Sequence, residues 1–557
     1  MQNEYNIVFI CLAAFMVNLA TTQDNPCAKR MAVAGYVCVC NETYCDTVER
    51  PSQLPRGQYY YYMTSEDSPG FTKTVGTFLN ISDTSNISSD VSIWVNSSVT
   101  YQTFSGVGAG ISDSSGINFN TLSSNSKQRF IESYFGVNGI EYTFGRIPVA
   151  ATDFSMRFYS YDDVPGDVDL KYFNLTEEDF TLKIPLIKMA MAASKRGLKL
   201  VATPWTPPSW MKTNNNSRIA YLYSQYQHTW TAYLLKYFEA YSENGINFWG
   251  LSQGNELILG MMVHFPMPNL AMMPDQLRSW TKYHLGPMLR ASNFKDVKVI
   301  TLDDERPFLP WFSNNVFSDK EAAQYIDGIA LHSYFDSDSN IDFLQEFHNN
   351  YPDKFILYTE NSLRGFGSKA VKLGSWDDAT NYITNLFQTF NHWVVGYMDW
   401  NIVLDENGGP SEGNSTHLDS PVIINVTNGE FYKQPLFYAL GHFSKFLPPG
   451  SIRVHVTTNQ NISDISKEEE QFLDQILREQ SDAATSPTGQ PGPPGPGPTT
   501  APSTTILALG AVNPDNSHTL IIYNPRSEQV NVTVTDKRVG TFQETIPPHS
   551  LNSFVYW

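Results

Sequence analysis

The hydrophobic pattern from about residue 104 to residue 446 is that of strands alternating with helices. Short apolar runs of strand length recur there, and longer stretches of helical periodicity separate them. The strand candidates are Gly106–Ser112, Glu141–Val149, Leu198–Thr203, Phe248–Gly254, Val297–Leu302, Ile326–His332, Lys354–Thr359 and Val394–Trp400. Parallel strands joined by crossover helices are predicted from this pattern, and closing the eight units gives a (β/α)8 TIM barrel of the α/β class.

An open, doubly wound sheet is the alternative arrangement of the same elements. It would be favoured by a glycine-rich phosphate loop after the first strand. The glycines of Gly106-Val-Gly-Ala-Gly110 lack the G-x-G-x-x-G spacing of that loop. The barrel is therefore the preferred prediction.

The two ends of the chain have a different pattern. Ser92–Gln102 and Ile506–Trp557 are rich in alternating β-branched and aromatic residues. They predict antiparallel strands. We expect both to join one β-sandwich side domain built from both chain ends, with the barrel inserted between them.

An insertion at about 464–505 interrupts the side domain. It begins with a helical stretch, Ser466–Gln480, in which Ser466 and Glu469 form a capping-box pattern. The following stretch, 488–503, is rich in Pro, Gly and Thr. Its few glycine triplets are too short for a collagen helix, so it is predicted to be a loop.

The N-terminus has the features of a secretory signal. Ile7 to Ala20 is mostly apolar and has the length of a signal core, and small residues follow at the cleavage zone. A signal anchor is the alternative, because no Lys or Arg precedes the run, but the run is short for a membrane span. The predicted division is a signal peptide at 1–22, a disulfide segment with the first side-domain strands at 23–103, the catalytic barrel at 104–446, and the remaining side domain at 447–557.

The cysteines are confined to the N-terminal region. Cys11 lies in the predicted signal, and the others are Cys27, Cys38, Cys40 and Cys45. Four neighbouring cysteines fit either a zinc site or two disulfides. Paired C-x-x-C units are absent, and the chain is predicted to be secreted, so two disulfides are the preferred interpretation.

Composition and sequons agree with a secreted globular protein. The chain has 56 acidic and 37 basic residues, a net charge of −19, which excludes a nucleic-acid partner because phosphate binding needs a basic surface. Ten Asn-x-Ser/Thr sequons behind a signal predict a glycosylated surface. The candidates are Asn41, Asn80, Asn86, Asn96, Asn174, Asn215, Asn414, Asn425, Asn461 and Asn531.

Polar residues follow several predicted strands, at the end of the barrel where active sites lie. The fourth strand leads into Asn255 and Glu256, and the seventh ends at Glu360. The other strand-end candidates are Asp113, Arg146, Trp205, Trp210, His332, Tyr334, Asp399, Trp400 and Asn401. One barrel mouth therefore collects carboxylates, tryptophans, amides and an imidazole.

Two carboxyl groups facing each other across a barrel mouth suit glycoside hydrolysis. One protonates the leaving oxygen, and the other attacks the sugar or activates water. Glu256 and Glu360 are the candidate pair. Carboxyls about 5–5.5 Å apart give retention of configuration, whereas a gap of roughly 6.5–9.5 Å gives inversion.

Each candidate also has a structural interpretation. A Glu after an apolar run is often the acidic first turn of a helix, Trp205 and Trp400 could belong to the core, and His332 could be a satisfied barrel histidine. Two such Glu residues with an adjacent Asn favour catalysis. The sequence shows neither metal-ligand spacing nor a G-x-S-x-G elbow, so it predicts no metal, no cofactor and no serine hydrolase.

Longer motifs reveal a family resemblance over nearly all of the mature chain. They are Cys38-Val-Cys-Asn-Glu-Thr-Tyr-Cys45, Phe144-Gly-Arg-Ile-Pro148, Leu182-Lys-Ile-Pro-Leu186, Pro204-Trp205, Trp210-x-Lys212-Thr-Asn214, Leu302-Asp-Asp304, Leu373-Gly-Ser-Trp-Asp377, Asp399-Trp-Asn401, Phe431-Tyr-Lys-Gln-Pro435 and Phe437-Tyr-x-Leu-Gly-His-Phe-Ser-Lys-Phe446. In these motifs the chain resembles glycoside hydrolase family 30, and within it the lysosomal glucosylceramidases.

The resemblance implies a retaining β-glucosidase that cleaves glucosylceramide to glucose and ceramide. It implies that Glu256 is the general acid/base, that Glu360 is the nucleophile and that Asn255 bonds the sugar 2-hydroxyl. It further implies that Asp113, Trp205 and Trp400 hold the glucose ring, that Arg146, His332 and Tyr334 support the nucleophile and the site, and that the disulfides are Cys27–Cys38 and Cys40–Cys45.

The chain departs from the family pattern near the site. Leu257 replaces a Pro, Gln253-Gly254 an Ala-Glu pair, Ser333 a Trp, and Thr359 and Asn361 a Ser and an Ala. The departures put aglycone preference and rate in question more than reaction type. A catalytically impaired glycolipid-binding relative, or a family 30 enzyme for another β-glycoside, remain alternatives.

An apolar, Met-rich stretch follows Glu256, Leu257–Met267 with Leu270–Met273. It fits lipid recognition, because Met-rich surfaces adapt to flexible apolar ligands, and it fits a buried loop equally well. The resemblance implies membrane glucosylceramide as substrate, with anionic lipid and a saposin-like activator as partners. It also implies a lysosomal or extracellular destination.

Overall fold

The computed structural model describes residues 24–79, 89–262, 267–363, 370–459 and 504–557. The predicted signal peptide, most of the 464–505 insertion and the sequons at Asn80, Asn86 and Asn461 lie outside these residues. The side chains of the other candidate sequon asparagines are partly or fully exposed. No helix among the described residues has the length and apolarity that crossing a membrane requires.

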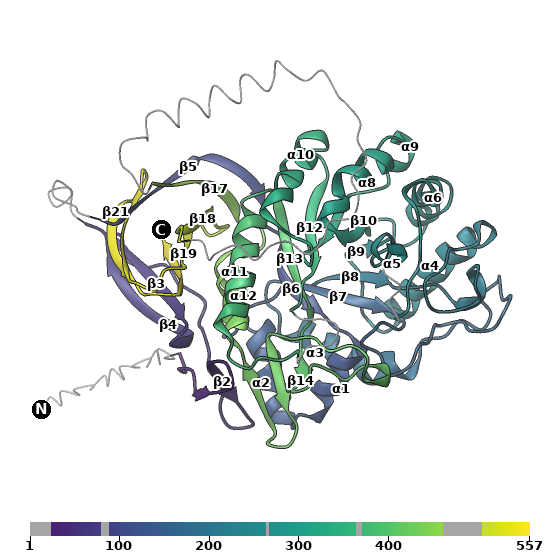
Figure 1. The fold of residues 1–557 in the computed structure, drawn as a ribbon, viewed down its shortest axis with the longest axis horizontal. Helices are drawn as coiled ribbons and strands as arrows, with labels where there is room; N and C mark the ends of the chain where they lie inside the picture. The colour runs from purple at the N-terminus through teal and green to yellow at the C-terminus, as the bar shows by residue number, and fades with distance from the viewer. Residues whose placement is uncertain (1–23, 80–88, 263–266, 364–369, 460–503) are drawn as a thin grey trace, which may run out of the picture.

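Eight parallel strands close into a barrel, as predicted (Figure 1). They are β6 (Gly106–Gly110), β7 (Phe144–Val149), β8 (Lys199–Pro204), β9 (Gly250–Ser252), β10 (Lys298–Glu305), β11 (Gly328–His332), β12 (Phe355–Glu360) and β13 (Val394–Asn401). All eight coincide with the predicted runs. Strand β9 is shorter than predicted, and β10 continues past Leu302 through three acidic residues whose side chains the fold buries.

Helices between the strands cover the outside of the barrel. They are α1 (Asp113–Thr121), α2 (Ser124–Phe135), α3 (Ile184–Ala193), α4 (Gln227–Glu243), α5 (Leu259–Met262), α6 (Pro274–Trp280), α7 (Gly286–Ala291), α8 (Leu309–Val316), α9 (Lys320–Ala323), α10 (Asp342–Asn350), α11 (Trp376–Phe390) and α12 (Pro435–Phe446). Helix α12 is buried on every face, because the barrel lies on one side of it and the side domain on the other.

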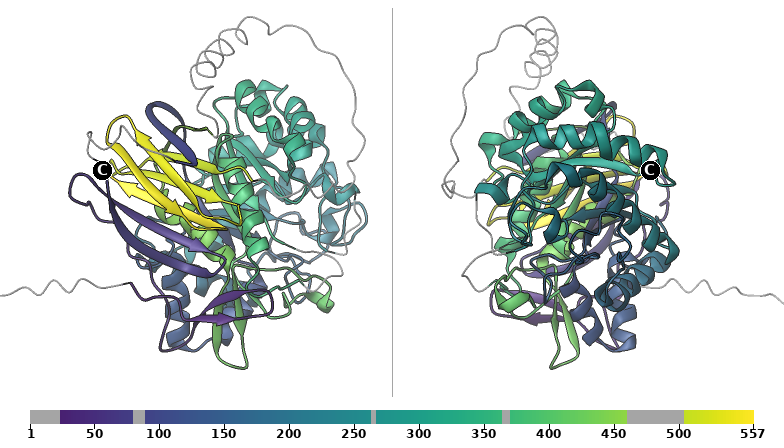
Figure 2. Two further views of the ribbon diagram at one scale, coloured as in Figure 1. Left: turned by 60° about the vertical axis from the view of Figure 1, so that its left-hand side comes forward. Right: turned by 90° about the vertical axis from the view of Figure 1, so that its right-hand side faces the viewer.

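The side domain is one nine-stranded sheet with the order β21-β20-β5-β17-β18-β19-β22-β3-β4. Its strands are β3 (Gln58–Ser65), β4 (Ser68–Thr77), β5 (Val91–Thr103), β17 (Ile452–Asn459), β18 (Leu507–Val512), β19 (His518–Asn524), β20 (Val530–Asp536), β21 (Gly540–Ile546) and β22 (Ser550–Tyr556). Figure 2 shows the N-terminal strands lying beside the C-terminal ones. The prediction of a domain built from both chain ends is confirmed.

The side sheet curls over a core of its own. Tyr59 of β3 and Phe542 of β21 lie near opposite ends of the strand order, yet their ring centroids are 4.3 Å apart. One detail corrects the prediction of antiparallel strands. β20 pairs with β5 in parallel; the two strands come from opposite ends of the chain, so no hairpin forces them to run in opposite directions.

A five-stranded sheet that the hydrophobic pattern did not reveal braces the N-terminal segment. It comprises β1 (Lys29–Met31), β2 (Tyr36–Cys40), β16 (Glu430–Lys433), β15 (Val422–Asn425) and β14 (Leu404–Asp405). Strands this short carry too little periodicity to be recognised. The pairing of β2 with β16 joins segments far apart in the sequence.

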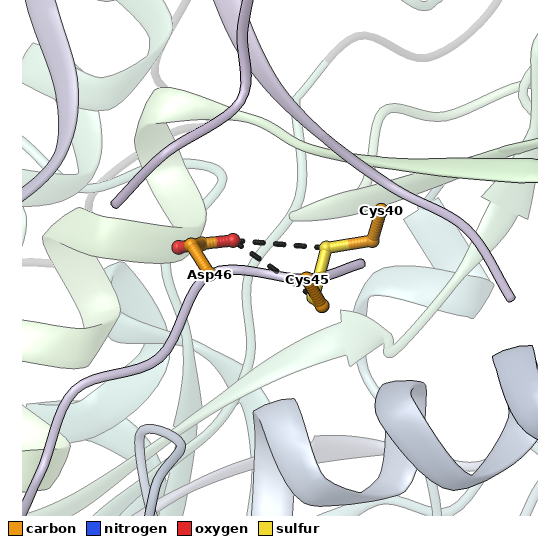
Figure 3. A group of neighbouring side chains, drawn as sticks. All are labelled: Cys40, Cys45 and Asp46. Atoms are coloured by element: carbon orange, nitrogen blue, oxygen red, sulfur yellow. Dashed lines mark hydrogen bonds between the residues drawn. A yellow bond between two sulfur atoms is a disulfide. The ribbon is translucent and has the colours of Figure 1, made fainter. Parts of the chain in front are cut away.

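Two disulfides, Cys27–Cys38 and Cys40–Cys45, close the N-terminal segment, as the resemblance implies. Asp46 lies beside the second one, with Oδ1 3.6 Å from Cys40 Sγ and 3.8 Å from Cys45 Sγ (Figure 3). Because the two sulfurs are bonded to each other, they are not thiolate ligands for a metal. The Asp46 carboxylate instead pairs with Lys433 Nζ at 3.0 Å and accepts from the Tyr438 hydroxyl at 2.6 Å.

A buried carboxylate, Glu141, ties three segments together. It is 1% exposed and contacts Arg50 of the N-terminal segment, Arg196 before β8 at 2.9 Å and Lys445 of α12 at 3.1 Å. Burial alone would raise the pKa of Glu141, but the three cations outweigh it and lower that pKa.

We expect Glu141→Gln to destabilise the fold by about 3–5 kcal/mol, because it leaves buried cations without their counter-charge. The free energy of unfolding in denaturant measures the loss. Glu346→Gln, at an exposed position of α10, is the matched control and should stay within about 0.5 kcal/mol of the wild type. Equal stability of the two variants would contradict the role assigned to Glu141.

Candidate active site

The parallel strands bring the predicted polar residues to one end of the barrel. Arg146 lies in β7, His332 ends β11 and Glu360 ends β12, while Asn255 and Glu256 follow β9. All five side chains are buried or nearly so. Because parallel strands share a direction, residues at their carboxyl ends meet at one mouth.

Glu360 is held by two donors. Arg146 Nη1 donates to its Oε2, and the Tyr334 hydroxyl donates to its Oε1 at 2.8 Å. Both contacts stabilise the ionised carboxylate. They fit the support that the resemblance implies for Arg146 and Tyr334.

His332 supports a different carboxyl from the one expected. Its Nδ1 lies 3.1 Å from Glu256 Oε1, and its Nε2 lies 3.2 Å from Asp303 Oδ1. The expectation that His332 donates to Glu360 is therefore corrected, because both ring nitrogens face other groups. Burial alone would lower the pKa of His332, but Glu360, Asp303 and Glu256 outweigh it and raise that pKa well above its usual range.

The surroundings of Glu256, the acid/base candidate, change its pKa. Burial raises the pKa of Glu256, and the charge of Glu360 adds to the rise, while His332 opposes it. One oxygen of Glu256, one of Glu360 and one nitrogen of His332 all lie within 4.8 Å of one another.

Asp303 links the catalytic groups, and the sequence reasoning gave it no role. It accepts from Arg146 Nη2 at 3.1 Å and from Ser252 and Thr359 at 2.5 Å each, besides its contact with His332. Burial would raise its pKa, but Arg146 and His332 lower it. Its place at a strand end, in the Leu302-Asp-Asp304 motif, was the available signal.

Asp304 holds the chain segment that carries Glu256. Its Oδ2 accepts from the backbone N–H groups of Ile258 at 2.8 Å and Leu259 at 3.1 Å. Burial and the nearby Glu256 raise the pKa of Asp304 to about 7. Asp304 therefore fixes the position of Glu256, the acid/base candidate.

The backbone of this region is strained. Glu256, Leu302 and Asp303 have φ values of 47°, 70° and 50°, in the left-handed region that non-glycine residues avoid. The N–H of Glu256 donates to the carbonyl of Asp303 at 2.9 Å. The strained segments thus brace each other, and such strain is typical of a functional site.

Trp205 and Trp400 form one aromatic wall. Their rings stack with centroids 5.1 Å apart, and each is 1% exposed. The Arg146 guanidinium carbon lies 4.9 Å from the Trp205 ring and 5.3 Å from the Trp400 ring. The two rings therefore fix Arg146, in addition to any contact with a ligand.

Asp113 does not meet the catalytic carboxyls. Its carboxylate accepts from Ser155 at 2.6 Å and from Tyr159, and it lies 3.7 Å from Lys183 Nζ. These partners hold a side chain that is only 2% exposed, and the implied role of Asp113 toward the glucose ring stays a prediction.

Asp153, which the sequence analysis did not name, is a further carboxyl near enough to Glu360 and Glu256 to be affected by their charges. It is partly exposed, and burial together with Glu360 and Glu256 raises its pKa well above the usual range. It follows β7 by four residues, so the search for polar strand ends could have included it.

The apolar stretch after Glu256 is largely buried where the structure describes it. Leu257, Ile258, Leu259, Leu270 and Met272 are each at most 7% exposed. For these residues the interpretation as a buried loop is favoured. Residues 263–266 lie outside the described part of the chain.

Comparisons with known proteins agree with this geometry. Residues 104–447 match the glycosyl hydrolase family 30 TIM-barrel domain, and residues 498–554 match the family 30 beta sandwich domain. The chain belongs to glycosyl hydrolase family 30. It is thus a glycoside hydrolase, of the β-glucosidase type.

Named relatives cover most of this family 30 chain. Lysosomal acid glucosylceramidase of Mus musculus is 32% identical, over 95% of each chain. Putative glucosylceramidase 3 of Caenorhabditis elegans is 38% identical, over 83% of this chain and 89% of the relative. The crystal structure of SrfJ from Salmonella typhimurium shares the fold, with a TM-score of 0.74 at 21% identity, over 90% of this chain and 99% of SrfJ.

We expect Tyr334→Phe to lower kcat/KM for an aryl β-glucoside roughly ten- to hundredfold. A hydrogen bond to a charged group contributes about 1.5–3 kcal/mol, and this one is lost from Glu360. The thermal midpoint should not change, because the ring is 39% exposed. Tyr283→Phe, at a side chain that is 63% exposed, is the matched control. Unchanged kcat/KM in Tyr334→Phe would rule out this contact as a support of Glu360.

Proposed function

We propose that this family 30 enzyme is a retaining β-glucosidase that hydrolyses glucosylceramide to glucose and ceramide. The observation that carries the proposal is the pairing of Glu256 and Glu360, with one oxygen of each within 4.8 Å of the other. Such closeness supports retention, which uses carboxyls about 5–5.5 Å apart. Inversion needs room for a water between them.

In the first step, Glu360 attacks the anomeric carbon while Glu256 protonates the departing glycosidic oxygen. The raised pKa of Glu256 keeps its proton available in mild acid. The product of this step is a covalent glucosyl–Glu360 ester and a free ceramide.

In the second step, Glu256 takes a proton from water, which attacks the ester and releases glucose. The negative charge of Glu360 is absent from the ester, so one cause of the raised Glu256 pKa disappears. His332, bonded to Glu256, then favours its ionised form. One residue can therefore act as acid first and base second.

Sugar-binding roles follow from the same contacts. The Asn255 carbonyl oxygen is held by Arg146 at 2.6 Å, which leaves the amide N–H groups to donate to the 2-hydroxyl. Asp113, as the resemblance implies, and Asp153 supply carboxyls for other hydroxyls. Trp205 and Trp400 border this space and keep Arg146 aligned.

The substrate and setting come from the relatives. Glucosylceramidases cover most of the chain, and the mouse protein is named lysosomal. We therefore extend the proposal to a lysosomal or secreted enzyme acting on membrane lipid, with anionic lipid and a saposin-like activator as partners. The predicted signal, sequons and disulfides agree with that pathway.

A different β-glucoside is the second candidate. An endo-1,6-beta-D-glucanase of Aspergillus fumigatus is 24% identical, over 82% of this chain and 85% of the relative. Incubation with glucosylceramide in detergent micelles and with a β-1,6-glucan separates the two. Release of glucose from the glucan alone would overturn the proposed lipid substrate.

We expect a cyclitol epoxide of gluco configuration to label Glu360 and to abolish hydrolysis of an aryl β-glucoside. Peptide mapping by mass spectrometry locates the adduct. Glu360→Gln should be inactive and unlabelled, with its thermal midpoint showing that it folds. Labelling of another residue, or activity in Glu360→Gln, would contradict the assignment of the nucleophile.

We expect the first sugar released to be β-glucose, as proton NMR can show before the anomers equilibrate. Glu256→Ala should accumulate the glucosyl–enzyme from a substrate with a good leaving group, because the second step lacks its base. Added azide should restore turnover and give β-glucosyl azide. First release of α-glucose would replace retention by inversion.

A further inference from the structure

Glu305 is a buried carboxyl beside the site that the proposed mechanism does not use. It ends β10, is 1% exposed, and is the register partner of His332 in the neighbouring β11. Its Oε2 accepts from the backbone N–H of Phe335 at 3.1 Å. Its Oε1 is buried and has no hydrogen-bond partner.

The contact with Phe335 fixes the turn that carries Tyr334. The turn runs from Ser333 to Asp336, closed by Asp336 N–H donating to the Ser333 carbonyl at 3.1 Å. Tyr334 and Phe335 are 39% and 41% exposed, so little packing holds them from outside. Glu305 anchors the turn at its middle, from the inner side.

The far end of the turn is anchored separately. Asp336 accepts from Tyr358 at 2.9 Å and from Asn385 at 2.7 Å, and Arg306 Nε lies 3.1 Å from its other oxygen. The part of the turn that carries Tyr334 therefore depends on Glu305, while the part at Asp336 does not.

Acidic groups surround Glu305. Glu256 after β9, Asp304 of β10 and Asp336 after β11 face it, and His332 is the cation that opposes them. The charge of Glu305 also acts on the Tyr334 hydroxyl. Arg306 uses Nε for Asp336 and Asn340 and Nη2 for the Ser337 carbonyl, while its buried Nη1 has no hydrogen-bond partner. Burial and these carboxyls raise the pKa of Glu305 well above its usual range, against the effect of His332.

We propose that Glu305 is a positioning residue that holds Tyr334 against Glu360 while its own carboxyl is protonated, so that the turn at 333–336 disengages when the carboxyl ionises. The proposal rests on the proposed β-glucosidase function and adds a pH-dependent control of the same site.

The direction follows from the charges. A protonated Glu305 is neutral, and its carbonyl oxygen accepts from Phe335 N–H. Only a neutral hydroxyl is then left without a partner, which costs less than a buried charge. An ionised Glu305 has a charged oxygen without a donor, buried among three carboxyl groups, which water can relieve only if the turn moves. Because the pKa of Glu305 is raised in the folded protein, its stabilisation of the 333–336 turn is complete at low pH. That stabilisation is lost as pH rises through the raised pKa.

The test compares pH profiles of kcat/KM for an aryl β-glucoside. Glu305→Gln keeps an oxygen that accepts from Phe335 N–H but cannot ionise, so we expect wild-type activity in acid and an alkaline limb displaced upward by roughly one pH unit. Glu346→Gln, at an exposed position of the helix after the turn, removes the same charge and should leave the profile unchanged.

A double variant links the effect to Tyr334. In a Tyr334→Phe background, Glu305→Gln should no longer displace the alkaline limb, because the hydroxyl that the turn delivers is absent. A displacement of the same size in both backgrounds would overturn the role through Tyr334. An alkaline limb that Glu305→Gln leaves unchanged would overturn the proposal. So would a downward displacement, which is expected if Glu305 acts only by raising the pKa of Glu256 through its charge.

Hydrogen exchange gives a readout that needs no turnover. The exchange rate of the Phe335 amide is divided by its intrinsic rate at each pH, which gives its protection from exchange. This protection should fall as pH rises in the wild type and stay constant in Glu305→Gln. Glu305→Ala should lose protection at every pH. If the wild type hydrolyses no aryl β-glucoside, the proposed function fails, and the exchange profiles still decide the role of Glu305. Equal profiles in wild type and Glu305→Gln would overturn it.

Discussion

The buried guanidinium of Arg146 is the interaction on which the active site depends. It contacts Glu360, Asp303 and Asn255, and the stacked rings of Trp205 and Trp400 lie within about 5 Å of it. A cation with no exposure to water is stable only with carboxylates around it. The groups proposed to carry catalysis are therefore also the groups that stabilise the buried Arg146, so the fold of the barrel mouth and its proposed chemistry depend on the same contacts.

Glu360 and Glu256, the two carboxyl groups near Arg146, have different hydrogen-bond partners. Glu360 accepts from Arg146 and Tyr334, whereas Glu256 faces a histidine that Asp303 holds from behind. Glu256, the proposed acid, is thus buried beside an anion, which favours its protonated form. It also lies next to His332, a cation that can stabilise its ionised form. That balance is what a residue with two successive proton-transfer roles requires.

Further carboxyls arrange the backbone near the pair. Asp304 binds the segment after Glu256, and Glu305 binds the turn that carries Tyr334. Both belong to the acidic end of β10, and burial raises the pKa of both. At low pH the carboxyls of Asp304 and Glu305 are protonated and neutral. In the proposal made above, the end of β10 therefore both shapes the site and makes its geometry depend on pH.

The sequence by itself determined the architecture, because the cause of each element is local. Apolar runs of strand length between helical stretches specified all eight barrel strands, and alternation at the chain ends specified the side domain. Polar residues at strand ends also predicted that Glu256, Glu360, Asn255 and Arg146 lie close together, since parallel strands must bring their carboxyl ends to one mouth.

Only the tertiary structure decided which groups meet. Nothing local to His332 directs its ring to Glu256 instead of Glu360, and nothing near Asp113 shows that Lys183, Ser155 and Tyr159 occupy it. Asp153 and Asp303 became site residues through contacts across the barrel. The physical reason is that a strand end places a side chain at the mouth, whereas its hydrogen-bond partner and its pKa depend on the packing of several strands at once.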